Sequence, residues 1–182
     1  MFMKIRRIRR ARSLTDYKKR VALLKGRLPR VVVRKSNRSV TAQLVAYEPD
    51  GDKVIASAHS RELAQLGWPP RGNIPTAYLT GMLLAKKQKA NGVGRVVLDT
   101  GISKPVKSNV LFAAAKGCAD GGLELINSIE FDPARLAGKH ISAYAALAAG
   151  QGSMFSKYRS AGIDPAKIDV LFEEVKKKIL SK

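Results

Sequence analysis

Residues 30–58 read RVVVRKSNRSVTAQLVAYEPDGDKVIASA, in which two turn signals separate three runs typical of β-strands. The first run, 30–36, is rich in β-branched residues, and the second, 39–47, alternates apolar and polar side chains as a half-buried strand does. Pro49-Asp50-Gly51 is typical of a tight turn and leads into the third run, 53–58. Because turns this short join antiparallel neighbours, the stretch predicts a three-stranded antiparallel meander.

Beyond the meander the apolar residues recur at helical spacing. A short helix is expected over 60–66, and longer helices are expected over 76–90 and 108–119. Short apolar runs at 95–98 and 123–126 predict two further strands, one between the long helices and one after them. The element order β-β-β-α-β-α-β indicates an α/β fold, in which helices cover both faces of a mixed sheet.

The chain in front of the meander is strongly basic. From Arg6 to Arg12 arginine recurs at nearly every position, and Ile5 and Ile8 are too few to form the apolar face of a mitochondrial targeting helix, the alternative for such a segment. A helix is then expected with Thr15 as its N-cap, Asp16 in its first turn and its end at Gly26.

The chain changes character again from residue 127 onward. Breaker-rich segments frame a possible helix over 141–149, and Asp164-Pro165 begins another. The apolar stripe of this last helix is expected to pack on this chain or on a partner. The expected division is a basic arm over 1–13, an α/β core over 14–126 and a C-terminal helical extension over 127–182.

The N-terminal charge indicates the class of partner. Fifteen of the first 38 residues are Lys or Arg and one, Asp16, is acidic, so this segment carries +14 of a formal net charge of +20. Like charges at this density repel one another in a compact fold. A polyphosphate backbone relieves the repulsion, because each neutralised phosphate releases condensed counterions. The distribution of charge therefore favours a nucleic-acid partner.

Composition excludes several other classes of protein. With 182 residues, 45% of them hydrophobic, the chain can bury a core, but no apolar run approaches the roughly 20 residues that a membrane span needs. No secretory signal follows the charged start, so we expect a cytoplasmic protein without a membrane partner. The single cysteine, Cys118, excludes an internal disulfide, and His59 and His140 lack the spacing of metal ligands. No metal or cofactor is expected.

Two sequence patterns point weakly to catalysis. Val97-Leu98-Asp99-Thr100-Gly101 is similar to an aspartic-protease loop, but that chemistry needs two carboxylates and would require a symmetric dimer. A two-metal nuclease would need several acids at strand ends, and only Asp99 and Asp120 are available. We interpret Asp99 as the end of a strand that turns into a helix, and we expect no enzyme.

Binding features are stronger than catalytic ones. Arg34 to Ser39 place three cations, an amide and hydroxyls at one hairpin tip, which suits phosphate and 2′-hydroxyl groups of RNA, although a solvated charged tip is the alternative. Single aromatics such as Tyr17 and Trp68 could stack on bases or anchor the fold. The candidate RNA contacts are Arg6, Arg7, Arg9, Arg10, Arg12, Tyr17, Lys18, Arg20, Arg30, Arg34, Lys35, Ser36, Asn37, Arg38, His59, Ser60, Lys104 and Lys107.

Several ordered blocks support a family resemblance. They are Thr15 to Arg20, Pro29 to Asn37, Ser57 to Leu63, Asn73 to Gly81 and Leu98 to Gly101. Together they resemble the universal eighteenth protein of the large ribosomal subunit, counted fifth in eukaryotes, in its longer archaeal and eukaryotic type. One departure is the pair Gly117-Cys118, which is expected to soften the helix that contains it.

The resemblance implies both a fold and a function. The fold would be a ribonuclease-H-like α/β/α core without catalytic acids. The function would be to bind 5S rRNA and help fix it to the central protuberance, beside large-subunit rRNA and neighbouring ribosomal proteins. The alternatives are a nucleic-acid-processing enzyme and a transient ribosome-associated factor that uses the same basic surface.

Overall fold

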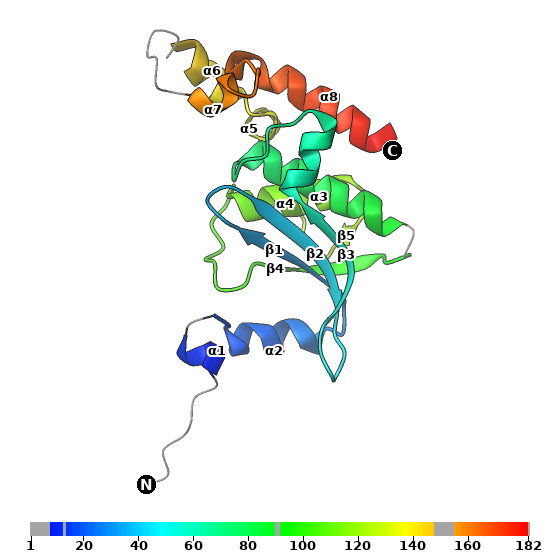
Figure 1. The fold of residues 1–182 in the computed structure, drawn as a ribbon. Coiled ribbons are helices and arrows are strands. Elements are labelled where there is room, and N and C mark those ends of the chain that lie inside the picture. The colour runs from blue at the N-terminus through cyan, green and yellow to red at the C-terminus, as the bar shows by residue number, and fades with distance from the viewer. Residues whose placement is uncertain (1–7, 13, 90–91, 148–154, 182) are drawn as a thin grey trace.

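The computed structural model describes residues 8–12, 14–89, 92–147 and 155–181. Its centre is a five-stranded sheet in the order β3-β2-β1-β4-β5 (Figure 1). β1 pairs antiparallel with β2, β2 antiparallel with β3, and β4 lies parallel to both β1 and β5. The predicted meander and the α/β class are confirmed. The strands are β1 (Arg30–Lys35), β2 (Val40–Ala46), β3 (Lys53–His59), β4 (Arg95–Asp99) and β5 (Glu124–Leu125).

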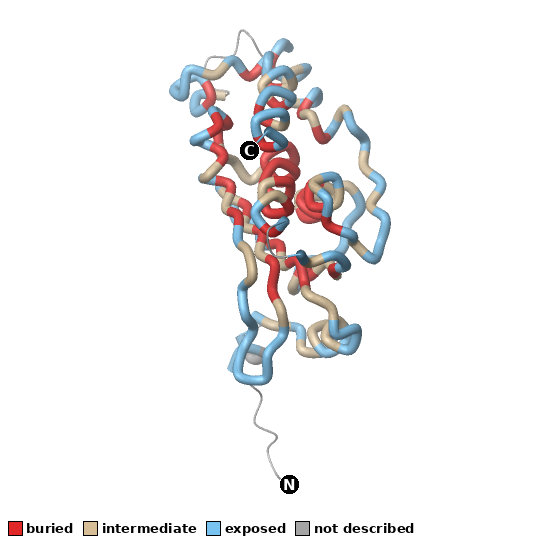
Figure 2. Tube along the Cα trace, turned by 90° about the vertical axis from the view of Figure 1, so that its right-hand side faces the viewer, coloured by how far each residue is buried: buried red, intermediate tan, exposed pale blue. Residues whose placement is uncertain are grey.

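The two faces of the sheet differ in their covering. α3 (Ile74–Gln88) and α4 (Val110–Asp120) pack on one face, where Val31, Val33 and Leu44 are fully buried. α2 (Tyr17–Lys25) lies on the other side of the sheet (Figure 1). Figure 2 shows the buried residues concentrated in the central helices and strands, while exposed residues mark the outer surface. The apolar core therefore lies between the sheet and the α3–α4 layer.

Close contact between α3 and α4 depends on glycine. A Cβ atom on Gly81 would overlap the carbonyl oxygen of Ala114, and one on Gly117 would overlap the carbonyl oxygen of Tyr78. The two backbones can approach this closely only because both residues lack a side chain. The expectation that Gly117 softens its helix is therefore corrected: α4 continues through it to Asp120, and Gly117 provides room for α3.

The starts of α2, α3 and α4 differ from prediction by one or two residues, because a nearby side chain caps each of these helices. Asp16, not Thr15, caps α2, and Asn73 caps α3 by accepting a hydrogen bond from Thr76 N. Asn109 caps α4 in the same way. The short helix η1 (Ser60–Leu66) covers the predicted range; it is a 3₁₀-helix whose N-cap is His59, and it ends at the left-handed Gly67.

Within its described residues, the C-terminal extension adds five short or medium helices. Its last one, α8, buries Ile168, Phe172, Val175 and Ile179, and it packs on α3, which confirms that the stripe packs on this chain. α5 is an addition to the prediction, because Asp132 caps it and Pro133 occupies its first position. The helices are α5 (Pro133–Ala137), α6 (Lys139–Leu147), α7 (Ser156–Arg159), η3 (Pro165–Lys167) and α8 (Ile168–Ser181).

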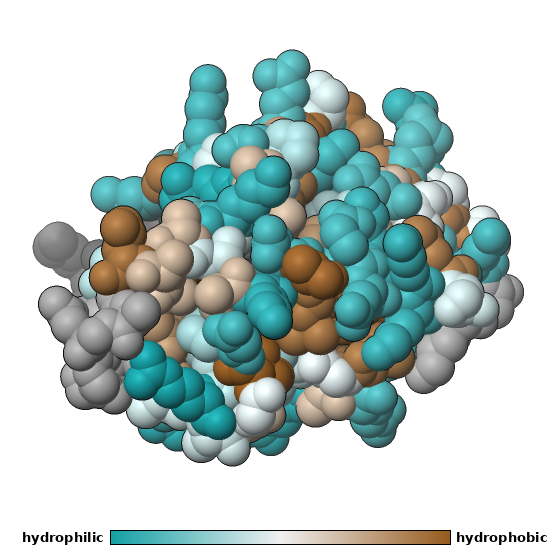
Figure 3. Space-filling model, turned by 90° about the horizontal axis from the view of Figure 1, so that it is seen from above, coloured by the Kyte–Doolittle hydropathy of each residue, from teal (hydrophilic) through white to brown (hydrophobic). Residues whose placement is uncertain are grey.

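The top of the molecule, formed by the C-terminal extension, has a mixed surface. Seen from above, hydrophobic side chains are interrupted by hydrophilic ones (Figure 3). Among the helices that the structure describes, none has both the length and the apolar character needed to cross a bilayer.

Candidate nucleic-acid interface

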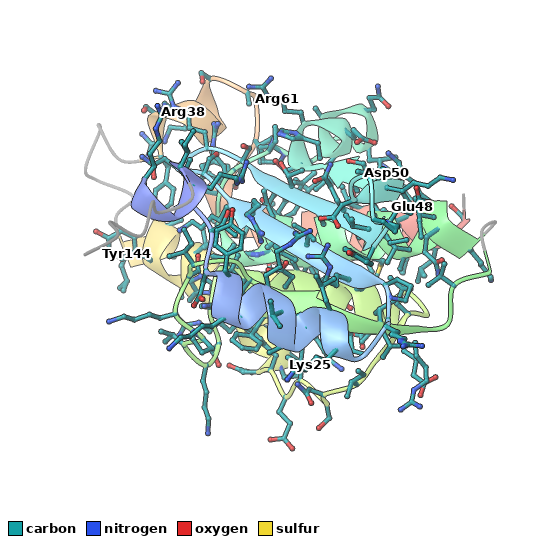
Figure 4. The ribbon with its side chains drawn as sticks, turned by 90° about the horizontal axis from the view of Figure 1, so that it is seen from below. Lys25, Arg38, Glu48, Asp50, Arg61 and Tyr144 are labelled. Atoms are coloured by element: carbon teal, nitrogen blue, oxygen red, sulfur yellow. The ribbon has the colours of Figure 1, made fainter. Side chains whose placement is uncertain are left out.

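α2 is attached to the sheet by polar side chains. None of its residues is buried, and Val21 is 53% exposed. Asp16 caps the helix by accepting hydrogen bonds from the backbone N–H groups of Lys18 and Lys19 at 3.0 and 3.2 Å. A helix of nine residues is marginal by itself in water. Its position therefore depends on the contacts that its long side chains make with the sheet, which α2 crosses when seen from below (Figure 4).

Four charged residues, Arg20, Asp52, Arg30 and Asp99, form a ladder of alternating sign. Both terminal nitrogens of Arg20 donate to the Asp52 carboxylate at 2.9 Å. Arg30 lies 2.7 Å from Asp52 as an ion pair through Nη2, without hydrogen-bond alignment, and donates from Nη1 to Asp99 Oδ2 at 3.1 Å. The ladder connects α2 to β1, to the β2–β3 turn and to the end of β4.

Arg30 is the enclosed member of this ladder. Only 1% of its surface is exposed, and two carboxylates compensate its charge. Its Nε has no hydrogen-bond partner among the described residues. Removing either carboxylate would leave part of a buried charge without compensation, so we interpret Asp52 and Asp99 as structural residues.

The turn after β4 is also fixed by polar contacts. Asp99 Oδ1 accepts a hydrogen bond from Gly101 N at 2.7 Å, and Arg34 Nη1 donates to the Asp99 carbonyl oxygen at 2.9 Å. Lys19 Nζ donates to Thr100 Oγ1 at 2.7 Å and to the Gly101 carbonyl oxygen at 3.0 Å. Both carboxylate oxygens of Asp99 are thus engaged, which agrees with its interpretation as the end of a strand.

The ladder changes the pKa values of its members. Burial by itself raises the pKa of Asp52, but the hydrogen bonds from Arg20 and the nearby positive charge of Arg30 outweigh it and hold that pKa below its ordinary value. The hydrogen bond to Asp52 raises the pKa of Arg20 in turn. The Arg20–Asp52 pair is therefore ionised at neutral pH.

The β1–β2 hairpin tip, residues 34–39, is a tight turn with exposed side chains. Ser36 N donates to the Ser39 carbonyl oxygen at 2.8 Å, and the two serine hydroxyls are 2.7 Å apart. Lys35, Asn37 and Arg38 are exposed, and among the described residues their side chains form no ion pair or hydrogen bond. Their polar groups are thus available to a partner on a turn that the serines hold in shape.

Two predicted contacts at the end of β3 support the hairpin from inside. The buried Ser60 accepts a hydrogen bond from Val40 N at 3.1 Å, and His59 Nδ1 accepts one from Arg61 N at 3.0 Å. Arg61 is exposed. Seen from below, Arg38 and Arg61 lie on one side of the molecule, whereas the labelled acids Glu48 and Asp50 of the β2–β3 turn lie on another (Figure 4).

The structure divides the predicted contacts into enclosed and exposed residues. Arg30 and Ser60 are 1% and 0% exposed, so the fold encloses both of these predicted contacts. Arg20 and Arg34 are engaged by Asp52 and Asp99, while Tyr17 and His59 are partly buried. Arg6, Arg7 and the side chain of Arg10 lie outside the described residues. The exposed candidates are Arg9, Arg12, Lys18, Lys35, Ser36, Asn37, Arg38, Lys104 and Lys107.

Three further cations lie close to the hairpin tip in space, although they were not among the predicted RNA contacts. Arg61 follows β3, Arg71 lies in the loop after Trp68, and Lys157 lies in α7. No local signal identifies Arg71 or Lys157, because tertiary contacts bring them together: Arg71 Nη2 donates to the Lys157 carbonyl oxygen at 3.1 Å. Arg61 was identifiable only as the neighbour of the predicted pair His59-Ser60.

Comparisons with known proteins agree on one family. The family described as "Ribosomal large subunit proteins 60S L5, and 50S L18" matches residues 2–93. A curated relative, "Large ribosomal subunit protein uL18" of Korarchaeum cryptofilum (strain OPF8), is 43% identical over 182 residues. That alignment covers 97% of this chain and 93% of the relative, so the similarity extends from the α/β core into the C-terminal extension.

Proposed function

Because this chain belongs to the uL18 family of large-subunit ribosomal proteins, we propose that it binds 5S rRNA and helps to anchor it to the central protuberance. The family has a structural role in the large subunit of the cytoplasmic ribosome, and RNA binding is typical of it. Large-subunit rRNA and neighbouring ribosomal proteins would be the other partners. The ribosomal role of the chain follows from its family, and 5S rRNA and the central protuberance are the proposed RNA and the proposed location.

The observation that carries the proposal is the exposed, rigid and basic β1–β2 hairpin tip. Lys35 and Arg38 present positive charge, and Asn37 presents both a donor and an acceptor. Phosphate contacts position a protein on RNA, while amide and hydroxyl groups suit the 2′-hydroxyl and base edges. The tip therefore supports recognition of a folded RNA by shape as well as by charge.

The N-terminal segment adds sequence-independent affinity. Arg9, Arg12 and Lys18 are exposed, and the ladder attaches α2, which contains Lys18, to the sheet. We assign them to phosphate neutralisation, together with Arg6, Arg7 and Arg10. Lys104 and Lys107, exposed in the loop between β4 and α4, would add a second group of phosphate contacts.

A titration with 5S rRNA at several salt concentrations, with excess tRNA as competitor, tests the proposal. We expect binding that survives tRNA, and a loss of about one unit of salt slope for each phosphate contact removed. Lys35→Gln combined with Arg38→Gln should therefore weaken binding and lower the slope by about two. Lys177→Gln is the matched control, because this lysine is exposed on α8, far along the chain from the tip.

Two outcomes would contradict the proposal. Binding that tRNA abolishes at moderate salt would show a polycation without selectivity for 5S rRNA. A double variant with unchanged affinity and slope would remove the hairpin tip from the interface. Circular dichroism of each variant separates loss of binding from loss of folding.

The alternative of a nucleic-acid-processing enzyme finds little support in the geometry. Asp99 is held by Arg30, Arg34 and Gly101, and no group of three potential metal ligands occurs within the described part of the chain. Burial raises the pKa of the Cys118 thiol to about 12, so it remains protonated and a poor nucleophile. RNA cleavage that requires divalent metal and is lost in Asp99→Ala would favour the enzyme instead.

A transient ribosome-associated factor remains the second alternative. Salt washing of large subunits separates it from a permanent component, because electrostatic contacts weaken as salt rises. We expect this protein to stay with the large subunit after the wash. Its complete release into the supernatant would favour a transient factor.

A further inference from the structure

Three segments far apart in the sequence lie side by side at one end of the molecule. The first is the hairpin tip and the second is the loop 67–73, where a Cβ on Gly72 would come within 2.7 Å of the Ser36 carbonyl oxygen. The third is α7, whose Lys157 carbonyl oxygen accepts the hydrogen bond from Arg71. The loop thus connects the tip of the core to the C-terminal extension.

The connection between the loop and α7 is fixed by more than one contact. The Arg71 guanidinium carbon lies 5.5 Å from the centre of the Tyr158 ring, and Asn73 Nδ2 donates to the Tyr158 hydroxyl at 3.1 Å. Tyr158 is 9% exposed, and its ring also packs edge-on against Phe155. The position of α7 relative to the loop, and through Gly72 relative to the hairpin tip, is therefore defined.

The three segments are basic and carry no acidic residue of their own. Residues 33–46, 67–77 and 155–163 contain no Asp or Glu. Lys35, Arg38 and Lys157 are exposed and take part in no ion pair among the described residues. Uncompensated charge gathered on one surface favours a polyanionic partner. The other cations of the three segments are Arg71, Arg159 and Arg34, the last of which is paired with Asp99.

The surface suits RNA better than a protein. Protein interfaces are usually centred on buried aromatic or aliphatic anchors. None of the large apolar residues exposed in the described part of the chain lies in these three segments. An acidic protein would therefore find charge here but no apolar anchor, whereas a phosphate backbone requires only the charge.

We propose that the loop 67–73 and α7 continue the hairpin-tip site, so that one RNA backbone runs from Arg38 past Arg71 to Lys157. This inference takes RNA as the partner from the proposed function, on which it rests, and adds the C-terminal extension to the interface. Lys157 contributes a direct phosphate contact. Arg71 sets the position of α7, and Gly72 sets the spacing between the loop and the tip.

The test compares Arg38→Gln, Lys157→Gln and the control Lys177→Gln in the full chain. Each variant is titrated at several salt concentrations with two probes, 5S rRNA and deproteinised large-subunit rRNA. We expect Arg38→Gln and Lys157→Gln to lower the salt slope by about 0.7 to 0.9 each with the same RNA. Lys177→Gln should leave the slope unchanged. Because Lys157 is exposed, its replacement should leave the fold intact, and circular dichroism verifies this.

The outcomes separate this inference from the proposed function. If the Arg38 variant changes 5S rRNA binding and the Lys157 variant changes neither RNA, the continuous site is wrong while the 5S proposal stands. If the two variants act on different RNAs, there are two sites and the continuous site is again wrong. If both act on large-subunit rRNA and the wild type ignores 5S rRNA, the continuous site is right and the 5S assignment is wrong. If the wild type binds neither RNA, both proposals are wrong.

Discussion

At the scale of single residues, Arg30 illustrates how burial changes the role of a basic side chain. In the sequence it is one of fifteen cations in a segment that favours RNA. In the structure it lies between Asp52 and Asp99. These two carboxylates, which are 22 and 69 residues further along the chain, decide its role. Arg30 is enclosed and compensated by the buried Asp99 and the more exposed Asp52, so the proposed RNA contacts fall to its exposed neighbours.

Gly117 gives the sharpest prediction at this scale. Gly117→Ala should lower the free energy of unfolding by about 3 kcal/mol, because its new methyl group would overlap the Tyr78 carbonyl oxygen and force α3 and α4 apart. Gly94→Ala is the control, since a Cβ there meets nothing within 4 Å and the backbone is not left-handed. Urea unfolding followed by circular dichroism measures both. Equal stabilities of the two variants would contradict the close contact.

At the scale of elements, the attachment of α2 should depend on pH through Asp52. Because the folded state lowers the pKa of this carboxyl, its contribution is complete above the unfolded pKa, about 4, and is lost as pH falls through the lower folded value. Asp52→Asn should reduce the free energy of local opening of α2 by about 1 kcal/mol at neutral pH. Hydrogen exchange of the α2 amides, read by mass spectrometry, measures this opening.

The neighbouring Asp50 supplies the matched control. It is exposed in the same β2–β3 turn, so Asp50→Asn changes the net charge equally without touching Arg20 or Arg30. In the Asp50→Asn variant, the protection of the α2 amides from hydrogen exchange should equal that of the wild type at neutral pH. It should also fall in acid as it does in the wild type. An Asp52→Asn protein that still loses α2 protection to the same extent in acid would assign the pH dependence to another group.

The elements show which parts of the fold a sequence can predict. The three strands of the meander follow from local periodicity and turns, and they appear where expected. The N-cap of α2 lies one residue after the predicted one. Thr15 and Asp16 are both good N-caps, and only the folded geometry selects Asp16. The same limit holds for the site: the hairpin tip is local and was predicted, while Arg71 and Lys157 meet only through tertiary packing.

At the scale of the whole molecule, removing the N-terminal arm should weaken RNA binding without lowering the stability of the fold. A protein that begins at Leu14 lacks six cations and no described core residue. We expect its salt slope with 5S rRNA to fall by up to about 5 units if each cation meets a phosphate, and its thermal midpoint to stay near that of the full chain. A large drop in the midpoint would show that the arm belongs to the fold.

The polar attachment of α2 also has a consequence for the order of events during synthesis. The ribosome makes residues 17–25 before Asp52 and Asp99, the carboxylates of the ladder on which α2 depends. The apolar core closes without any residue of α2. α2 is therefore synthesised well before it can dock, and until then its cations are free to meet a nascent RNA.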